Sequence, residues 1–164
     1  MKITNTSNRL YPLIILVVTA QLVYLNSLSN HFTYDDEFTI VNNYFIKTWT
    51  NVSSLFNKEY FTLSGELSYR PVVTLSYFID YALWQLNPLG YHLTNSLLHT
   101  FNTVFLFFLS LGFFKQRVIA FLTALLFACH PVLSEAVNAV SYREDLLGTA
   151  FMTAAFLLYL KAGK

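Results

Sequence analysis

The sequence predicts an all-α membrane protein with about four transmembrane helices. Three observations lead there: the composition, the lengths of the apolar runs and the placement of the basic residues. Hydrophobic residues make up 55% of the 164 residues and charged residues only 12%, whereas soluble domains carry about 25% charged residues. A spanning helix needs about 20 predominantly apolar residues, and several runs approach or reach that length.

The expected spans are the ranges 10–28, 92–114, 118–132 and 146–161. The first two reach spanning length by themselves, and the last two reach it only by continuing into polar sequence. An outer helical segment, 134–146, is expected to run directly into the last span. A cleaved signal peptide is the alternative interpretation of 10–28, but the apolar core of a signal peptide has only about 7–15 residues.

The charged residues predict which ends of these helices face the cytoplasm. All nine acidic residues lie within 29–91 and 130–146. Basic residues without acidic neighbours flank the other helix ends, at Lys2, Arg9, Lys115, Arg117, Lys161 and Lys164. The positive-inside rule then predicts cytoplasmic N- and C-termini, with the loops 29–91 and 130–146 on the outer, periplasmic or luminal side. A net charge of +1 argues against nucleic acid as a partner.

The long outer loop 29–91 contains a candidate amphipathic helix at 70–86. Pro71 suits a first helical turn, and the apolar residues that follow recur at helical spacing. Tyr77, Tyr81 and Trp84 are amphipathic rings that favour a membrane interface. We therefore expect an interfacial helix along the outer leaflet. A full span is the alternative, and it would place Asp80 in lipid.

Three adjacent acids, Asp35, Asp36 and Glu37, follow the first helix closely. Their mutual repulsion should raise the pKa of at least one of them unless a cation or a metal lies near. A carboxylate held at a membrane surface can serve as general base toward an acceptor hydroxyl. The alternative is a solvated acidic turn without a chemical role.

Two further polar clusters are candidates for function. On 92–114, one face carries His92, Asn95, Ser96, His99, Asn102 and Thr103, which must meet protein or water rather than lipid. This face fits a functional cavity and helix–helix hydrogen bonding equally well. After Pro131, which should break the third helix, the spacing predicts a second polar stripe of Glu135, Asn138, Tyr142, Asp145 and Thr149.

Arg143 lies two helical turns beyond Glu135, where it could bind an anion. Ionisable residues at membrane depth are functional candidates, and a structural network of Arg143 with carboxylates is the alternative. No metal site is assigned, because neither His130 with Glu135 nor His92 with His99 has a specific ligand spacing. A divalent metal cofactor is neither predicted nor excluded by the sequence. The single Cys129 excludes an internal disulfide.

Five motifs in order carry a family resemblance. They are NHFTYDDEFTIVNN at 30–43, SYRP at 68–71, GYHLTNSLLH at 90–99, HPV at 130–132 with EAV at 135–137, and REDLL at 143–147. Together they resemble the N-terminal membrane region of the transmembrane-and-tetratricopeptide-repeat O-mannosyltransferases and their bacterial relatives. Those proteins are similar to the protein O-mannosyltransferases of the GT-C class, so the resemblance implies the N-terminal part of a GT-C-like fold.

The resemblance implies a glycosyltransferase that moves a mannose-type sugar from a polyprenyl-phosphate carrier to a hydroxyl acceptor on protein or glycan. It implies catalytic roles for Asp35 and Asp36. It also implies roles in binding substrate or the carrier phosphate for Glu37, Arg70, His92, His99, His130, Glu135, Arg143 and Asp145. A guanidinium matches phosphate oxygens in geometry, and it would stabilise the leaving group as charge develops.

Two departures from the family pattern matter. Leu133 stands where the family often has a second histidine, and the family continues through many more membrane helices. We therefore expect a fragment, a split gene product or a remnant from a bacterial inner membrane, inactive alone and needing C-terminal helices or a partner subunit. The alternative function is a catalytically inactive, truncated membrane protein that binds lipid or a partner subunit. A small transporter is disfavoured, since the midplane positions of the apolar runs lack charge.

Overall fold

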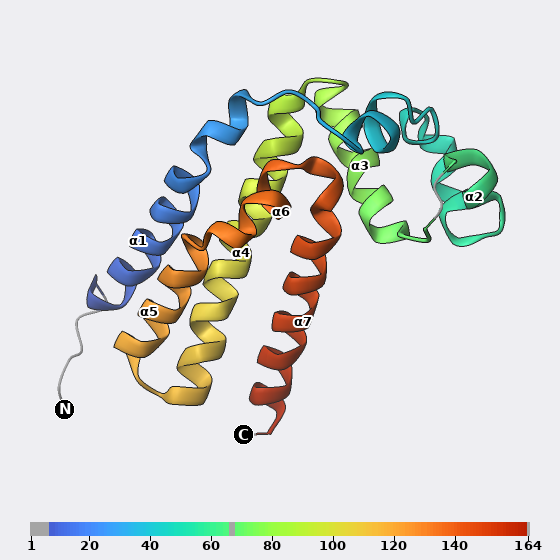
Figure 1. Cartoon of the computed structure of the whole chain (residues 1–164). Helices are drawn as coiled ribbons and strands as arrows, with labels where there is room; N and C mark the ends of the chain where they lie inside the picture. The colour runs from blue at the N-terminus through green and yellow to red at the C-terminus, as the bar shows by residue number, and fades with distance from the viewer. Residues whose placement is uncertain (1–6, 66–67, 164) are drawn as a thin grey trace.

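The computed structural model describes residues 7–65 and 68–163, with side chains from residue 10 onward, and these residues form helices and loops without a strand. Lys2, Lys164 and the side chain of Arg9 lie outside the described residues. The bundle consists of α1 (Ser7–Val23), α4 (Pro88–Phe114), α5 (Arg117–Ala128) and α7 (Arg143–Ala162). A smaller lobe, residues 31–84, sits beside one end of the bundle (Figure 1).

Helix α4 is the central element, because it packs against α1, α5 and α7. Its 27 residues give a length of about 40 Å. The helix begins before the expected residue 92, because the Asn87 side chain accepts a 3.2 Å hydrogen bond from the Leu89 N–H and Pro88 suits the first helical position. It ends where Lys115 adopts a left-handed backbone, with φ of 55°. The polar face predicted on this helix is buried against the rest of the protein.

The described chain is a membrane protein with two helical segments long and apolar enough to span a bilayer, Pro88–Phe114 and Val140–Ala162. A third span is counted if Arg117–Ala128 and Pro131–Asn138, which meet at a bend of 47°, cross together. Helix α1 is apolar but shorter, and a short 3-10 helix, Leu25–Ser29, follows it. The total of about four spans stays a prediction.

The helix expected over 118–132 ends earlier, at Ala128. Its end follows from Pro131, because a residue before proline is disfavoured in the helical region of backbone angles. His130 accordingly has an extended backbone, with φ of −71° and ψ of 124°. A short turn, Pro131–Leu133, and the brief helix α6 (Ser134–Asn138) continue the chain.

The continuous helix expected over 134–161 is broken as well. Ala139 has an extended backbone, with φ of −96° and ψ of 123°, and a 3-10 turn, Val140–Tyr142, leads into α7. The predicted stripe from Glu135 to Thr149 is therefore divided between two helices. The residue spacing does not predict this break, because side chains distant in sequence stabilise it.

The lobe packs around an aromatic core that includes Phe45, Tyr60 and Phe78. It contains the short helical segments Glu37–Val41, Phe45–Lys47 and Trp49–Phe56, then α2 (Glu59–Ser64) and α3 (Pro71–Trp84). The Phe45 ring lies 5.9 Å from that of Tyr60 and 5.4 Å from that of Phe78. These edge-to-face contacts join the long outer loop into a packed unit.

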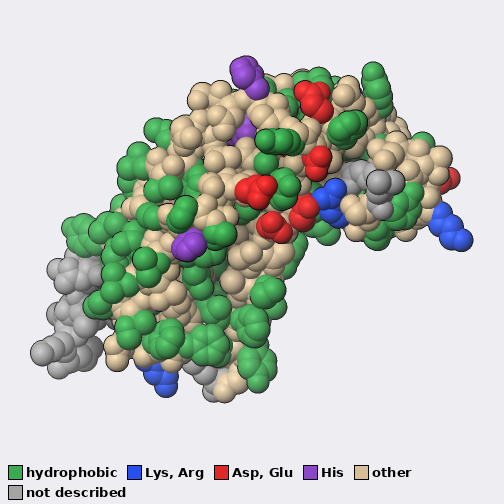
Figure 2. Space-filling model, viewed as in Figure 1, with side chains coloured by type: hydrophobic (Ala, Val, Ile, Leu, Met, Phe, Trp, Pro, Cys, Tyr) green, Lys and Arg blue, Asp and Glu red, His purple; other side chains and the backbone are tan. Residues whose placement is uncertain are grey.

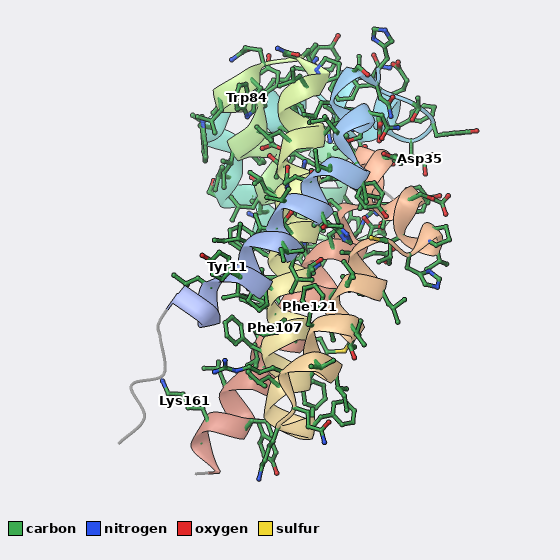
Figure 3. The ribbon with its side chains drawn as sticks, turned by 90° about the vertical axis from the view of Figure 1, so that its left-hand side faces the viewer. Tyr11, Asp35, Trp84, Phe107, Phe121 and Lys161 are labelled. Atoms are coloured by element: carbon green, nitrogen blue, oxygen red, sulfur yellow. The ribbon has the colours of Figure 1, made fainter. Side chains whose placement is uncertain are left out.

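Helix α3 corresponds to the expected helix 70–86 and separates two faces. Tyr77, expected at the interface, is buried with Val73 and Phe78. Val72, Ile79 and Leu83 are exposed by 45%, 47% and 68%. This exposed apolar face fits a helix lying on a membrane surface, which stays a prediction. Behind it, a Cβ at Gly90 would come within 2.1 Å of the Trp84 ring, so only glycine permits this close turn between α3 and α4 (Figure 3).

Candidate functional site

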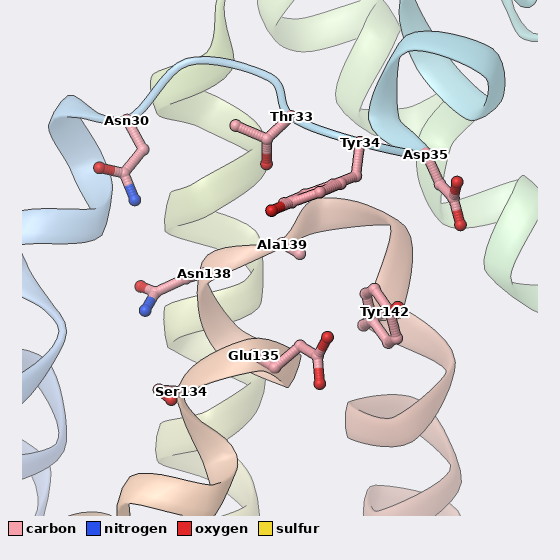
Figure 4. A pocket seen from close by; sticks show the side chains of 9 residues that line it. All are labelled: Asn30, Thr33, Tyr34, Asp35, Ser134, Glu135, Asn138, Ala139 and Tyr142. Carbon is pink, nitrogen blue, oxygen red and sulfur yellow. The ribbon is translucent and has the colours of Figure 1, made fainter.

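A cavity of about 570 Å³ opens between the loop after α1 and the broken segment before α7. Figure 4 shows side chains from residues 30–35 facing those from residues 134–142 across this space. We call it the first cavity. Its lining carries two carboxylates, a phenol and several neutral polar groups, from Asn30, Thr33, Tyr34, Asp35, Ser134, Glu135, Asn138, Ala139 and Tyr142.

The adjacent acids Asp35 and Asp36 have different environments. Asp36 is fully buried, and its carboxylate accepts hydrogen bonds from the Ser141 N–H at 2.7 Å and the Thr33 N–H at 3.1 Å. Asp35 is exposed and lines the first cavity. Tyr34 precedes the pair with φ of 50°, a backbone rarely adopted by a bulky residue. Such outliers cluster at functional sites, and this one lies beside the cavity.

Asp35 also lines a second cavity of about 310 Å³, on the side of the lobe. Arg70 belongs to this second cavity and pairs with Glu144 at the start of α7. The Arg70 and Glu144 side chains keep 30% and 36% exposure. One exposed carboxylate thus borders both a cavity rich in neutral polar groups and a cavity that contains a guanidinium.

Three side chains from separate parts of the chain hold the break before α7. The Asp36 carboxylate accepts from Ser141 N, the Tyr77 hydroxyl donates to the Val140 carbonyl at 3.0 Å, and the Asn95 amide donates to the Ala139 carbonyl at 3.2 Å. We call Asp36, Tyr77 and Asn95 the backbone clamp. The Ser141 N–H thereby has a side-chain acceptor in place of a helical one, and the Ala139 and Val140 carbonyls accept from side chains in addition to the local bonds from Tyr142 N–H and Arg143 N–H. These contacts stabilise the interruption and so shape one wall of the first cavity.

Arg143 lies directly after the clamp and is fully buried. Its guanidinium donates to Asn95 Oδ1 at 2.8 Å, Ser76 Oγ at 3.0 Å and the Tyr91 carbonyl at 3.2 Å. It also pairs with Asp80 at 2.7 Å and stands over the Tyr77 ring. These partners surround the guanidinium and leave it no exposed surface. The geometry therefore does not favour the expectation that Arg143 binds an anion.

Asp80, considered a problem for a spanning helix, is the buried partner of Arg143. Burial raises the pKa of the Asp80 carboxyl, and the Arg143 guanidinium and the Thr94 hydroxyl each oppose that rise. Thr94 donates to Asp80 Oδ1 at 2.8 Å. A buried pair of this kind is weak evidence for net stability, but loss of one partner leaves an uncompensated charge. The pair therefore locks α3, α4 and α7 in one arrangement.

The three predicted site histidines lie apart from the two cavities. His92 and His99 are fully buried on α4, and His99 Nε2 lies 3.2 Å from the Ala128 carbonyl at the end of α5. The His99 ring also stacks on Phe127. His130 is exposed, and its Nδ1 accepts from the Val132 N–H at 3.2 Å. In this arrangement His99 joins two helices and His130 caps a turn.

The remaining predicted acids are exposed. Glu37 and Asp145 are exposed and lie outside both cavity linings. Glu144 and Asp145 occupy the first turn of α7, where negative charge is favoured by the helix dipole. Figure 2 shows several acidic side chains beside a basic one where the bundle meets the lobe. Within residues 7–65 and 68–163, no group of three or more His, Cys, Asp or Glu side chains is placed to hold a metal ion.

Comparison with known proteins places the chain among enzymes named for sugar transfer. A protein O-mannosyl-transferase of Caenorhabditis elegans is 35% identical over 159 residues, which cover 91% of this chain and 23% of that protein. Protein O-mannosyl-transferase TMTC3 of Mus musculus is 35% identical over 166 residues, covering 98% of this chain and 18% of the relative. TMTC2 of Homo sapiens is 35% identical over 144 residues, covering 85% of this chain and 17% of the relative.

The chain belongs to the family of the TMTC protein O-mannosyl-transferases. It spans about a fifth of the length of these curated relatives. No family model matches the chain, and no solved structure matches it. The resemblance identified from the sequence motifs is thereby confirmed at the level of the family.

Several features of this TMTC family member could not be assigned from the sequence. Tyr77 was predicted to face the membrane interface, but it belongs to the backbone clamp. Asn95 was one of several residues on a polar face with no individual role. Tyr142 was placed on a continuous stripe, whereas it reaches the first cavity because that stripe is broken. The available signal was the polar face of α4, which indicated that this helix holds other backbone segments.

Proposed function

We propose that this chain forms the catalytic outer part of a protein O-mannosyltransferase. The reaction transfers a mannose-type sugar from a polyprenyl-phosphate carrier to a hydroxyl group of a protein. The observation that carries the proposal is the position of Asp35, an exposed carboxylate shared by two cavities. In the alternative, the chain is a catalytically inactive membrane protein that binds lipid or a partner subunit. The names of the relatives support the transfer of a sugar to protein, and carrier and acceptor belong to the proposal.

In the proposed reaction, Asp35 accepts the proton of the acceptor hydroxyl as general base. The hydroxyl oxygen forms a bond to the anomeric carbon of the sugar. The bond between that carbon and the phosphate oxygen breaks, and its electron pair leaves on polyprenyl phosphate. Asp36 is a positioning residue, since its two hydrogen bonds hold the turn from which Asp35 projects.

Each cavity is assigned one substrate. The second cavity contains Arg70, whose planar fork of N–H donors suits the carrier phosphate. The pair with Glu144 holds Arg70 in place before the carrier arrives. The first cavity receives the acceptor, with neutral polar side chains, Glu135 and Tyr142 along its wall. Arg143 is proposed to support this wall from inside the protein. An indirect contribution to substrate binding, or one made together with parts outside this chain, is proposed for Glu37, His92, His99, His130 and Asp145.

The proposed topology places the two cavities on the outer side of the membrane. The described ends of the chain lie at the opposite end of the bundle from the cavities (Figure 1), and basic residues flank that end. With α1, α4, α5 and α7 as four spans of a GT-C-like fold, both termini face the cytoplasm. In a bacterial inner membrane the site would face the periplasm. Because the chain spans about a fifth of its relatives, further helices or a partner subunit would complete the groove for the carrier lipid.

A transfer assay tests the proposal. Membranes that contain the protein would receive polyprenyl-phosphate mannose with labelled sugar and peptides with serine and threonine. The proposal expects label in the peptide with wild-type protein and its loss with Asp35→Asn. Glu59→Gln is the matched control, because Glu59 is an exposed acid of the lobe outside both cavities. Carrier binding without any transfer by the wild type would favour the inactive alternative.

A further inference from the structure

A groove at the end of the bundle opposite the cavities has the features of a lipid site. It lies between α1 and α5 and has a volume of about 270 Å³. Its walls are almost entirely apolar and aromatic, and they come from Tyr11, Pro12, Ile15, Arg117, Val118 and Phe121, with Arg117 itself exposed at the surface. Tyr11 and Val118 are exposed by 61% and 71%. Figure 3 shows Tyr11 on α1 and Phe121 on α5 near each other along this side of the bundle.

Arg117 stands at the start of α5 without an acidic partner in this part of the chain. The ion pairs recorded among the described residues join Arg70 to Glu144 and Arg143 to Asp80. Every acidic residue of the sequence lies within 35–80 or 135–145, and those that the structure describes lie toward the end of the bundle with the two cavities (Figure 1). Lys115 and Lys161 add further positive charge near Arg117's end of the bundle. Among the described residues, no carboxylate therefore pairs with Arg117.

We propose that this groove binds one anionic phospholipid, with its phosphate on Arg117 and an acyl chain between α1 and α5. The turn between α4 and α5 would lie at a membrane surface, because α4 is long and apolar enough to span a bilayer and ends at Phe114. A guanidinium matches phosphate oxygens, and anionic leaflets attract basic residues near the surface. The apolar walls select a lipid over free phosphate. This site is independent of the proposed transfer reaction.

Native mass spectrometry of the purified protein tests the proposal directly. One sample of the protein would be purified in the presence of phosphatidylglycerol and a second in the presence of phosphatidylcholine. The number of lipids bound to each would then be counted. We expect retained phosphatidylglycerol on the wild type and about tenfold weaker binding for Arg117→Gln, a loss of about 1.4 kcal/mol, since the variant lacks the charge that pairs with the phosphate. Lys161→Gln is the matched control, because Lys161 carries the same charge outside the groove.

A fluorescence measurement locates the acyl chain. In Phe121→Trp, a low fraction of phosphatidylglycerol with brominated chains should quench the new tryptophan more strongly than it quenches the tryptophan of Leu158→Trp, on the exposed face of α7. Trp49 and Trp84 form a common background in both variants. Equal quenching, equal retention of phosphatidylcholine, or displacement of the lipid by millimolar inorganic phosphate would each overturn the proposal.

Discussion

The Asp36 carboxylate accepts a 2.7 Å hydrogen bond from the Ser141 N–H, 105 residues further along the chain. This contact joins the acidic motif after α1 to the interruption before α7. Both groups are buried, so the bond is shielded from water and fixes the loop against the wall of the first cavity. Asp36 therefore holds the loop in place from a buried position, while its neighbour Asp35 is exposed and lines the first cavity.

Replacing Asp36 by Ala should lower the stability of the protein. Two backbone N–H groups, of Thr33 and Ser141, would lose their acceptor, and a buried unsatisfied donor costs about 1–3 kcal/mol. Thermal unfolding in detergent would measure the loss. Asp36→Asn, which keeps one acceptor oxygen, should fall between the wild type and Asp36→Ala. A melting temperature of Asp36→Ala equal to that of the wild type would refute this account of Asp36.

Removing the Tyr77 hydroxyl should loosen the wall of the first cavity. Tyr77→Phe deletes the hydrogen bond to the Val140 carbonyl and keeps the ring. We expect faster hydrogen–deuterium exchange in peptides covering 139–143. The matched control is Tyr91→Phe, whose hydroxyl also donates to a backbone carbonyl, that of Gln85, at 2.8 Å. Equal exchange at 139–143 in the two variants would argue against a clamp.

The buried pair of Arg143 and Asp80 should show strong coupling. Arg143→Met or Asp80→Leu alone leaves a buried charge without its partner, at a cost of about 3–5 kcal/mol. The double variant should lose clearly less stability than the sum of the two single variants. Chemical unfolding of all four proteins would give the coupling energy. Additive losses would mean that the 2.7 Å ion pair contributes no specific interaction.

The pair between Arg70 and Glu144 should compete with the carrier phosphate for the guanidinium. Glu144→Gln removes the competing charge, so the KM for the polyprenyl-phosphate donor should fall. Arg70→Gln should raise that KM, because the second cavity loses its guanidinium. Initial rates at varied donor concentration distinguish the two effects. A donor KM that stays unchanged in Arg70→Gln would remove Arg70 from the carrier site.

How far the sequence predicts this protein depends on whether an interaction is local. The apolar runs and the polar face from His92 to Thr103 predicted α1 and the buried side of α4, since periodicity indicates which face of a helix meets protein. The end of the third helix shifted because His130 precedes Pro131, a local effect whose exact residue is hard to place. The break at Ala139 depends on Asp36, Tyr77 and Asn95, which are distant in sequence, so no local pattern revealed it.

The candidate site was predictable to a similar degree. The acidic motif drew attention to Asp35 and Asp36 together, but spacing could not separate their roles. The packing of Ser141 against Asp36 separates their environments, and the difference in their roles belongs to the proposal. Arg143 was a reasonable candidate for anion binding by residue type, and its burial became visible only once α3, α4 and α7 were placed together.

The most direct test of the central claim compares transfer and stability in Asp35→Asn and Asp36→Asn side by side. The account predicts that Asp35→Asn lowers kcat by about 10²–10⁴-fold, the usual contribution of a general base, at an unchanged melting temperature. Asp36→Asn should lower the melting temperature and reduce transfer less. Transfer at the wild-type rate by a folded Asp35→Asn protein would contradict the assignment of Asp35 as general base.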